Sequence, residues 1–469
     1  MNDAAPIRPL PGSPIEVHII ETPGLGNRSY LATDGTVAVV IDPQRDIDRI
    51  FTITALLGVR LTHVFETHVH NDYVTGGLTL ARQTGAEYVV AAAEDVAFER
   101  RGMAHGDTIL TGALRVTAIA TPGHTHHHLA YVVADAASGA VAGTFTGGSV
   151  LYGTVGRTDL AGPEHTDRLT RAQWRSAHRL VDAVPNSAAI WPTHGFGSFC
   201  SGGTGSGAVE STAGDERRSN PALILNEASF LAGFLAGLGP YPAYYRHMAS
   251  LNRSGPAPLA STPLPSVGPA GLRRRIDAGE WVVDLRPRSR FAAGHLPGSV
   301  NVEGIAAVAT YVGWVVTWGA PISLIGPDEA TIAAVRQALG RIGIDPVAGH
   351  VVTDGSAVNP FDSAAYPVRT FADLAAAVTA GRPLTILDVR AGDEWREGHL
   401  PGAVHIPWHD LRSRLGELPA GRDIWVHCAA GLRAAIAASL LQRADLRPVL
   451  VDDRWWQVYD TGLAVEEAA

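Results

Sequence analysis

The sequence predicts an α/β fold class, and three observations lead to this prediction. Over about the first 200 residues, short β-branched runs alternate with glycine-rich turns, as in "VAVVID" at 37–42 and "LAYVVA" at 129–134. From Val282 onward, segments typical of strands alternate with segments typical of helices, which favours parallel sheets covered on both faces. Hydrophobic residues make up 46% of the chain and charged residues 18%, a balance typical of folded domains with buried cores.

Length, charge and cysteine content limit the classes of function that the chain can have. A chain of 469 residues is long enough for about three domains. Its net charge of −9, without Lys- or Arg-rich runs, argues against a nucleic-acid partner. Cys200 and Cys428 lie far apart and imply no disulfide framework, which fits a reducing compartment. The opening "MNDAAPIRPLPGSP" has no apolar core after a basic region, so we expect a cytoplasmic protein without a secretory signal.

One uncharged segment, from Gly304 to Gly326, is long enough to suggest a membrane span. Pro321 and several glycines weaken that interpretation, and the segment lies inside the repeat described below. We therefore predict a helix followed by a buried strand there, and no membrane partner.

The second half of the chain contains an internal repeat. "VVDLRPRSRFAAGHLPGSVNV" begins at Val282, and "ILDVRAGDEWREGHLPGAVHI" begins at Ile386, so equivalent residues are 104 apart. A fixed offset of this kind indicates a duplicated domain. Each copy has the pattern of a buried strand, a helix, a "GHLPG" turn, a helix, a buried strand and a helix.

Composition divides the chain into four segments. Residues 14–255 form the first predicted domain, and the Pro-rich residues 256–268 form a semi-rigid linker. Residues 269–356 and 366–466 form two further domains, one for each copy of the repeat.

In the second copy, "DIWVHCAAGLRAAIAASLL" places Cys428 after a strand and before a helix. The residues from Cys428 to Arg433 would form a loop whose backbone N–H groups point inward at the positive end of the helix. Together with Arg433, this setting favours a thiolate and makes Cys428 a candidate nucleophile. A buried cysteine at the end of a core strand is the alternative interpretation.

The motif Cys-x-x-Gly-x-Arg, together with "GHLPGA" and Asp388, resembles the rhodanese family. This resemblance implies doubly wound parallel-sheet domains and a sulfurtransferase in which Cys428 carries a sulfane sulfur as a persulfide. Arg433 would assist, and the loop that holds the persulfide would consist of Ala429, Ala430, Gly431 and Leu432. One departure is "VDDRWW", where the family usually has Gly-Gly ahead of the last Trp-bearing turn.

The first copy lacks these reactive groups. An offset of 104 places Leu324 opposite Cys428, and Glu329 opposite Arg433. We interpret this copy as a degenerate rhodanese domain, because no nucleophile is present. The residues that it shares with the second copy would maintain the fold: Asp284, Arg286 and His295.

Histidines follow several predicted strands of the first domain. His68 and His70, in "HVFETHVHNDY", come where an apolar strand enters a loop, and two imidazoles at this spacing can share a metal. His124 in "TPGHTHHHLAYV" and His194 in "WPTHGFGSFC" are candidates to complete the shell. This clustering at strand ends favours a metal site. Solvent exposure or local packing is expected for the neighbours of His124 at positions 126–128.

The set resembles the metallo-β-lactamase superfamily, and within it the persulfide dioxygenases fused to rhodanese domains. The matching motifs are "IDPQRD", "PGHT", "GRTDL" and "PTHG". The resemblance implies an αβ/βα four-layer sandwich with one Fe²⁺ per chain, which activates O2 to oxidise a low-molecular-weight thiol persulfide to sulfite. Fused family members are often homo-oligomers.

In this family, His68 and His124 match metal-ligand positions, with other polar residues around them. Gly148 stands where the family has a liganding aspartate, and Tyr73 replaces a second-metal histidine. The resemblance therefore implies at most one metal. If His70 turns inward, His68, His70 and His124 make a three-histidine site. The expected supporting or substrate-contacting residues are Asp72, Tyr73, Arg157, Asp159 and His194.

Three functional hypotheses follow from these resemblances. The first is a persulfide dioxygenase that oxidises a thiol persulfide with O2, while Cys428 exchanges sulfane sulfur with sulfite or thiosulfate. The second is a sulfurtransferase whose metallo-β-lactamase-like domain is catalytically silent, which the missing carboxylate at Gly148 favours. The third is a thioester hydrolase with one Zn²⁺. Cys200 is either a relay thiol or an ordinary loop residue.

Overall fold

The structure is a computed structural model that describes residues 7, 9–203, 205–260, 262–345, 347–353 and 364–467. The chain divides into two compact units. The N-terminal unit comprises Met1–Ala260 with Gly340–Gly343, and the C-terminal unit comprises Ser261–Leu339 with Ile344–Ala469. Linker residue 261 and the predicted domain end at residue 356 lie outside the described residues.

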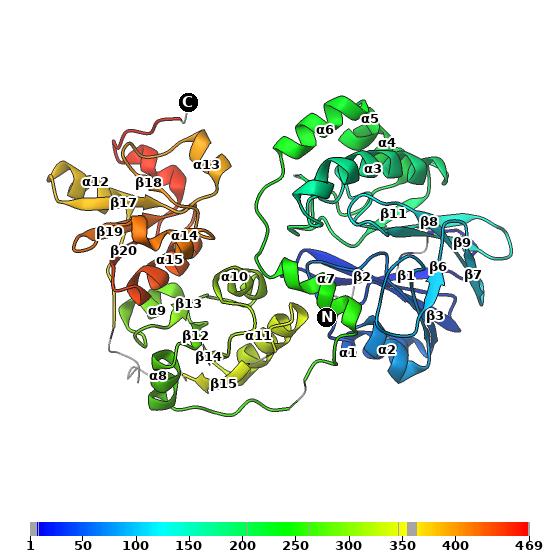
Figure 1. Ribbon diagram of the computed structural model, residues 1–469, viewed down its shortest axis with the longest axis horizontal. Coiled ribbons are helices and arrows are strands. Elements are labelled where there is room, and N and C mark those ends of the chain that lie inside the picture. Colours follow the sequence, from blue (N-terminus) through cyan, green and yellow to red (C-terminus); the bar gives the residue numbers. More distant parts are fainter. Residues whose placement is uncertain are drawn as a thin grey trace. The chain divides into compact units, whose positions relative to one another are not determined.

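Two sheets form the centre of the N-terminal unit (Figure 1). The first has the order β1-β2-β3-β4-β5-β6 and is parallel from β3 to β6. Its strands are β1 (Glu16–Thr22), β2 (Asn27–Thr33), β3 (Val37–Ile41), β4 (Arg60–Phe65), β5 (Glu87–Ala91) and β6 (Arg101–Met103). The second has the order β11-β10-β9-β8-β7 and is antiparallel except between β10 and β11. Its strands are β7 (Thr108–Thr111), β8 (Leu114–Ala120), β9 (Leu129–Asp135), β10 (Val141–Gly147) and β11 (Ala189–Pro192).

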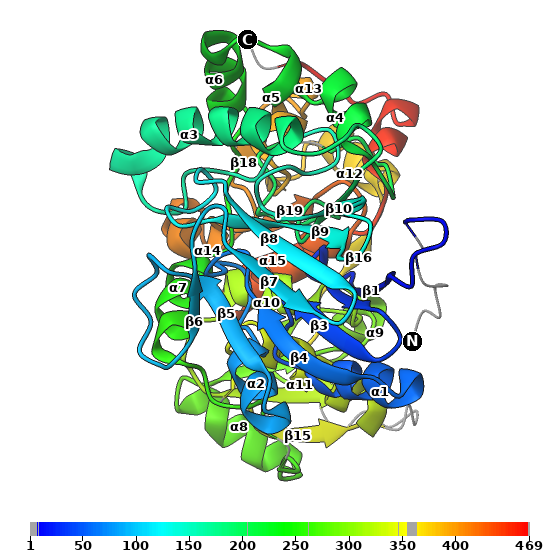
Figure 2. The same ribbon diagram turned by 90° about the vertical axis from the view of Figure 1, so that its right-hand side faces the viewer.

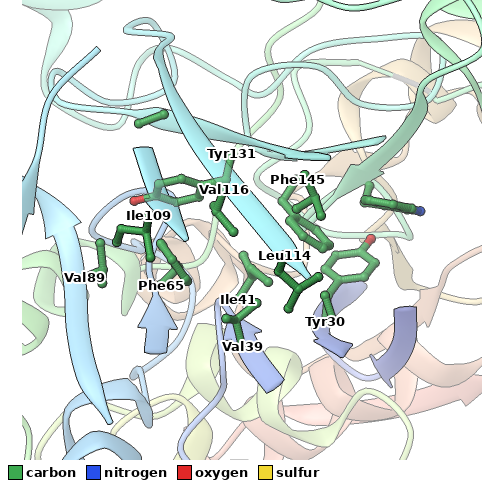
Figure 3. Close-up of a cluster of buried hydrophobic side chains, with 14 of the residues drawn as sticks. Tyr30, Val39, Ile41, Phe65, Val89, Ile109, Leu114, Val116, Tyr131 and Phe145 are labelled. Carbon is green, nitrogen blue, oxygen red and sulfur yellow. The ribbon is translucent and has the colours of Figure 1, made fainter. Parts of the chain in front are cut away.

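The main hydrophobic core lies between these two sheets (Figure 3). Successive side chains of a strand point to opposite faces, so β3 directs Val39 and Ile41 into this core. Ala38 and Val40 of the same strand belong to a second cluster, which includes side chains of the outer helices. Phe65 and Tyr131 pack edge to face across the sheets, with ring centroids 4.9 Å apart.

Helices cover the outer faces of both sheets, which produces four layers (Figures 1 and 2). Helices α1 (Asp48–Leu57) and α2 (Gly77–Thr84) cover the first sheet. Helix α3 (Pro163–Asp182) packs on the second. The remaining helices of the unit are α4 (Ala213–Ser219), α5 (Pro221–Ile224), α6 (Glu227–Ala236) and α7 (Tyr245–Ser254). This layering confirms the predicted α/β fold class.

The C-terminal unit contains two parallel sheets, with the orders β13-β12-β14-β15 and β16-β20-β19-β17-β18 (Figure 1). The elements of the first part are α8 (Pro269–Asp277), β12 (Trp281–Asp284), α9 (Arg288–Ala293), β13 (Val300–Asn301), α10 (Val308–Val315), β14 (Ile322–Gly326), α11 (Glu329–Arg341) and β15 (Val347–Val352). Those of the second are β16 (Val368–Arg369), α12 (Phe371–Thr379), β17 (Leu384–Asp388), α13 (Gly392–Glu397), β18 (Val404–His405), α14 (Leu411–Arg414), β19 (Asp423–His427), α15 (Leu432–Arg443) and β20 (Arg447–Val451). The predicted elements occur in the predicted order in each copy, with one short additional strand, β13 or β18, directly after the turn.

The segment from Gly304 to Gly326 contains α10 followed by the buried strand β14, as predicted. Among the residues that the structure describes, no helix has the length and apolarity needed to cross a membrane.

The two copies use the same internal ion pair. Arg286 donates to Asp284 (2.7 Å) and to the Gly294 carbonyl, while Arg390 donates to Asp388 (2.6 Å) and to the Gly398 carbonyl. The equivalent histidines also contact a carbonyl four residues earlier: His295 that of Phe291, and His399 that of Trp395. These contacts connect the strand end to the "GHLPG" turn in both copies.

The predicted equivalence of Leu324 with Cys428 is wrong. Asp284 is paired with Ile325 in the first sheet, and the equivalent Asp388 is paired with His427 in the second. Gly326 is therefore the structural counterpart of Cys428, because the first copy has two more residues between the turn and the third strand. Glycine supplies no nucleophile, so the first copy still lacks the reactive group.

The buried pair of the second copy gives a stability prediction. Asp388 is fully buried and Arg390 is 2% exposed, so Asp388→Ala leaves a guanidinium without its counter-charge. We expect the free energy of unfolding of the C-terminal unit to fall by about 3–5 kcal/mol. Urea denaturation, followed through the unfolding transition of this unit, measures the change. The control is Asp423→Ala, which breaks an exposed pair with Arg447 (2.7 Å) and should cost less than about 1 kcal/mol. Equal losses for both variants would contradict the role of the buried pair.

Candidate metal centre and cysteine loop

Four histidines follow strand ends in the two sheets of the N-terminal unit. His68 and His70 follow β4, His124 follows β8, and His194 follows β11. All four side chains are buried. Loops at strand ends bring them together because the strands themselves fix where each loop begins.

The ligand atoms of His68, His124 and His194 lie within 4.8 Å of one another. Each ring is oriented through its Nδ1. His124 Nδ1 donates to the Arg157 carbonyl (2.7 Å), and His68 Nδ1 lies 2.9 Å from Thr67 Oγ1. Such contacts select the tautomer whose Nε2 carries a lone pair.

His194 is held by a carboxylate and an amide. Its Nδ1 lies 3.2 Å from Asp72 Oδ2 and 3.0 Å from Asn27 Oδ1. Asn27 in turn donates to Asp72 through its Nδ2 (2.7 Å). This is the arrangement in which a carboxylate orients a metal-binding imidazole. Asp72 therefore lies where it can orient the His194 ring.

The Nε2 atoms of the three rings lack ordinary hydrogen-bonding partners. Those of His68 and His194 are 3.3 Å apart, and both would present lone pairs once the Nδ1 atoms carry the hydrogens. His124 Nε2 is buried and makes no hydrogen bond with the described residues. Burial also lowers the pKa of His68 and takes that of His124 to about 3, so both rings are neutral. A divalent transition metal fits these three nitrogens and satisfies all of them.

His70 does not belong to this group, contrary to the predicted set of His68, His70 and His124. Its Nε2 lies 3.2 Å from Asp42 Oδ1 and 3.2 Å from Glu66 Oε2. Burial alone would lower the pKa of His70. The two carboxylates raise it to about 10, so the ring is charged. The structure thus places His194 where the sequence suggested His70. The described residues contain two further groups within the same distance, His70–Asp72–His194 and Asp42–Glu66–His70.

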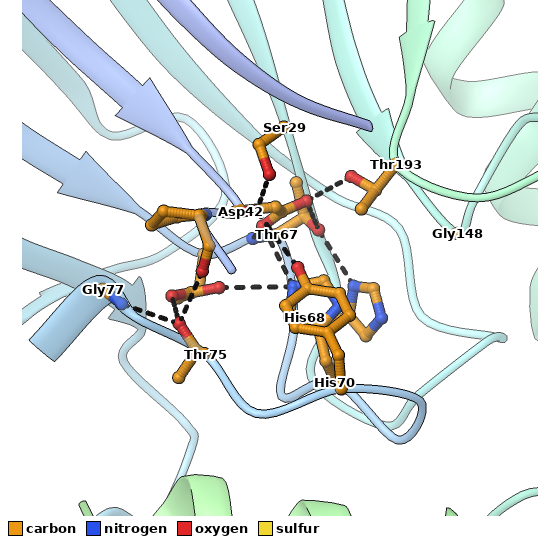
Figure 4. A network of polar contacts seen from close by, with 12 residues as sticks. Ser29, Asp42, Thr67, His68, His70, Thr75, Gly77, Gly148 and Thr193 are labelled. Atoms are coloured by element: carbon orange, nitrogen blue, oxygen red, sulfur yellow. Dashed lines mark hydrogen bonds and ion pairs between the residues drawn. The ribbon is translucent and has the colours of Figure 1, made fainter. Parts of the chain in front are cut away.

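Asp42 accepts several of the hydrogen bonds in the polar network around the histidines (Figure 4). Its carboxylate accepts hydrogen bonds from the Thr67 backbone and side chain (both 2.7 Å) and from Thr193. Although burial raises the pKa of a carboxyl group, His70 holds the pKa of Asp42 below its usual value. Sequence reasoning missed Asp42 and Glu66. The signal was their position, since Asp42 opens "DPQRD" and Glu66 precedes "THVH".

Gly148 leaves no room for the carboxylate that the family resemblance implies. A Cβ at this position would lie 2.2 Å from Cδ2 of His124, so the imidazole occupies that space. The Gly148 N–H donates to His128 Nε2 (3.0 Å), and the His128 ring stacks on His68 at 4.8 Å. His128 is therefore packed beside the centre, whereas His127 is exposed.

Gly148→Asp gives the second prediction. We expect this variant to be destabilised by about 1–3 kcal/mol and to hold less metal than the parent chain, because the His124 ring must move. Urea denaturation and metal analysis measure the two effects. In the control, Gly203→Asp, a Cβ meets only Thr154 Oγ1 at 3.5 Å, so little change is expected. A Gly148→Asp protein with higher metal content and unchanged stability would contradict the packing argument.

The other expected supporting residues lie beside the centre or brace it. Tyr73 is buried, stacks on His70 at 4.3 Å and donates to the Asp42 carbonyl. Arg157 binds Asp159 through two hydrogen bonds (2.7 and 2.8 Å) and holds His124 through its own carbonyl. Burial raises the pKa of the Cys200 thiol, which favours the ordinary-residue interpretation over a relay thiol.

In the C-terminal unit, Cys428 lies between β19 and α15 and is 2% exposed. Gly431, at φ 85°, lets the loop turn into the helix. The Ala429 carbonyl accepts a hydrogen bond from the Trp455 backbone (2.9 Å). Arg433 lies at the helix N-terminus, where its guanidinium donates to both carboxylate oxygens of Glu394. Sequence reasoning missed Glu394, since nothing in its motif marks it as a partner of Arg433.

Known proteins resemble both units. A rhodanese-like domain model matches residues 269–316 and 370–461. The mitochondrial persulfide dioxygenase ETHE1 of Homo sapiens is 28% identical over 228 residues, which cover 47% of this chain and 80% of that protein. A hydroxyacylglutathione hydrolase of Cereibacter sphaeroides is 29% identical over 238 residues, or 49% of this chain and 82% of that one.

Among solved structures, the metallo-beta-lactamase from Staphylococcus aureus subsp. aureus COL superposes with a TM-score of 0.65 at 25% identity. The match covers 72% of this chain and 99% of that one. The chain is therefore a metallo-β-lactamase-fold region similar to persulfide dioxygenases, fused to rhodanese-like domains.

Proposed function

We propose that the N-terminal unit oxidises a low-molecular-weight thiol persulfide at one iron ion and that Cys428 carries sulfane sulfur in the C-terminal unit. The observation that supports the first activity best is the group of three buried imidazoles whose Nδ1 atoms are all held by other residues. Similarity to persulfide dioxygenase ETHE1 supports the substrate class.

His68, His124 and His194 would hold the metal, and bound iron would supply the activation of O2. The chain's own contribution is orientation. Asp72 and the Arg157 carbonyl keep two rings in the tautomer that presents Nε2. Burial of the centre excludes bulk water from the reacting groups.

At Cys428 the reaction would be a covalent sulfur transfer. The thiolate attacks the outer sulfur of a persulfide RS–SH, which forms the Sγ–S bond and breaks the RS–S bond. The thiol leaves as RS⁻ and Cys428 becomes a persulfide. The N–H groups of the loop, which we expect to face inward, and the N-terminus of α15 (Leu432–Arg443) would stabilise the transferred sulfur.

A silent N-terminal unit is the second candidate. Gly148 favours this candidate, because it stands where the family has a liganding carboxylate. The His124 ring fills the space that a side chain at this position would need. The chain would then act only through Cys428. A zinc-dependent thioester hydrolase, which the hydroxyacylglutathione hydrolase relative suggests, is the third.

Metal analysis of the anaerobically purified full chain, combined with an oxygen electrode and glutathione persulfide, separates these functions. About one iron per chain with persulfide-dependent O2 consumption supports the proposal. Zinc without O2 consumption favours a hydrolase. Protein that binds neither metal, yet accepts sulfur on Cys428, contradicts the dioxygenase activity and leaves the sulfurtransferase.

A further inference from the structure

Carboxylates neutralise the positive charges next to the Cys428 loop. Arg433 donates to Glu394 through both terminal nitrogens, at 2.5 and 2.7 Å. Burial alone would lower the pKa of Arg433, but the pairing with Glu394 raises it. Burial alone would raise the pKa of Glu394, but Arg433 lowers it. Arg390, stacked on the Trp455 ring at 3.6 Å, is paired with Asp388. Each guanidinium therefore has a full counter-charge.

A second acidic group touches the loop itself. A Cβ built on Gly431 would lie 2.0 Å from Asp452 Oδ1 and 3.0 Å from Arg288 Nε, so the carboxylate and its guanidinium partner both contact the loop backbone. Arg288 also donates to the Ala430 carbonyl through Nη2 (3.5 Å). Asp452 is the first aspartate of "VDDRWW", the segment that departs from the family's usual Gly-Gly.

Asp452 is only partly neutralised. Arg288 donates to it through Nε (2.8 Å) and also forms an ion pair with Glu303. One guanidinium between two carboxylates leaves a net charge of −1. The two neutral pairs described above do not offset it, so these three arginines and four carboxylates together carry a net charge of −1.

We propose that this negative charge makes Cys428 selective for organic persulfides and against thiosulfate. The inference rests on the proposed sulfur transfer through Cys428 and specifies its substrate class. With thiosulfate, the same attack breaks the S–S bond and releases sulfite, a dianion that develops beside Asp452. With an organic persulfide, the leaving group is a thiolate with one charge on its sulfur. Like charges held close together in a partly buried site repel strongly.

The same transition state governs the reverse reaction. Sulfite attacking the Cys428 persulfide would bring its two charges against the same carboxylate. Sulfite is therefore expected to be as poor an acceptor as thiosulfate is a donor. Sulfur would pass from Cys428 to another thiol.

The test compares the rate at which thiosulfate and glutathione persulfide load sulfur onto Cys428 in the full chain. Peptide mass spectrometry follows the gain of one sulfur atom and distinguishes Cys428 from Cys200. We expect glutathione persulfide to react at least about tenfold faster than thiosulfate. Asp452→Asn should raise the thiosulfate rate about tenfold, and the glutathione persulfide rate by no more than about threefold, because half as much charge develops on that leaving sulfur. A tenfold change corresponds to about 1.4 kcal/mol.

Glu394→Gln provides a second variant, because it frees the Arg433 charge while glutamine can still cap α13 (Gly392–Glu397). It should also raise the thiosulfate rate. The matched control is Asp453→Asn. Asp453 binds the backbone N–H groups of Phe371 and Arg454 and makes no ion pair among the described residues. It should change neither rate.

The outcomes separate this selectivity from the function on which it rests. Equal loading of the parent chain by both donors, or an unchanged thiosulfate rate in both test variants, overturns the selectivity and leaves the sulfur transfer intact. An equal gain in Asp453→Asn also overturns it, since the effect would then not depend on contact with the loop. No loading of Cys428 by either donor overturns the proposed transfer and this inference together.

Discussion

Replacement of Cys428 by serine is expected to lower the anaerobic transfer of sulfur from glutathione persulfide to free cysteine by about 10³-fold or more. A hydroxyl group at the end of β19 (Asp423–His427) is not ionised at neutral pH and cannot accept the outer sulfur of a persulfide. Persulfide-dependent O2 consumption should change by less than about twofold, because the proposed function assigns it to the histidine centre of the other unit. Alkylation of the cysteine persulfide product, followed by mass spectrometry, gives the transfer rate.

The control for this experiment is Cys200→Ala. Cys200 is fully buried in the N-terminal unit, and a small apolar residue can replace it with little cost. If Cys200 is an ordinary packed residue, the variant keeps both activities. A Cys428→Ser protein that loses O2 consumption and transfer together would contradict two independent sites. A Cys200→Ala protein that loses transfer would restore the relay-thiol hypothesis.

The layers of the fold could be predicted from the chain because they depend on local periodicity. In β3 (Val37–Ile41), all five residues are hydrophobic and buried, which is the pattern of a strand covered on both faces. The repeated strands were recognisable from Asp284 and Asp388, whose neighbours form the same turn. The two extra residues of the first copy were not recognisable, since they fall in a loop that the sequence pattern does not constrain. Only strand pairing reveals that Gly326 matches Cys428.

The candidate centre was predictable in its composition and not in its geometry. Strand-end positions indicated four histidines, of which His68, His70 and His124 were the predicted ligands and His194 a supporting residue. The nitrogens that converge in the structure are those of His68, His124 and His194. Asp42 and Glu66 determine the direction in which the His70 ring points. The charge balance of these three buried groups cannot be derived from the spacing of residues in the sequence. The same limitation applies to Asp452, whose contact with Gly431 is visible only after folding.

Replacement of His194 by alanine gives the sharpest test of the metal centre. The structure assigns His194 to the group with His68 and His124, so the variant removes one of three nitrogens. We expect metal affinity to fall at least about 100-fold. This fall is larger than the one expected when a carboxylate that only orients a ligand ring is removed. O2 consumption should fall below detection, and sulfur loading of Cys428 should stay within about twofold of the parent chain. That retained activity shows that the C-terminal unit remains folded.

His70→Gln distinguishes this centre from the set of His68, His70 and His124 that the sequence suggested. Glutamine can donate a hydrogen bond toward Asp42 or Glu66 and so limits the cost of two buried carboxylates that have lost their counter-charge. It cannot replace an imidazole as a metal ligand of comparable strength. If the three rings identified by their converging nitrogens hold the ion, His70→Gln keeps most of its metal and His194→Ala loses it. The opposite result would mean that His70 turns inward when metal binds, and would return the ligand set to the one expected from the sequence.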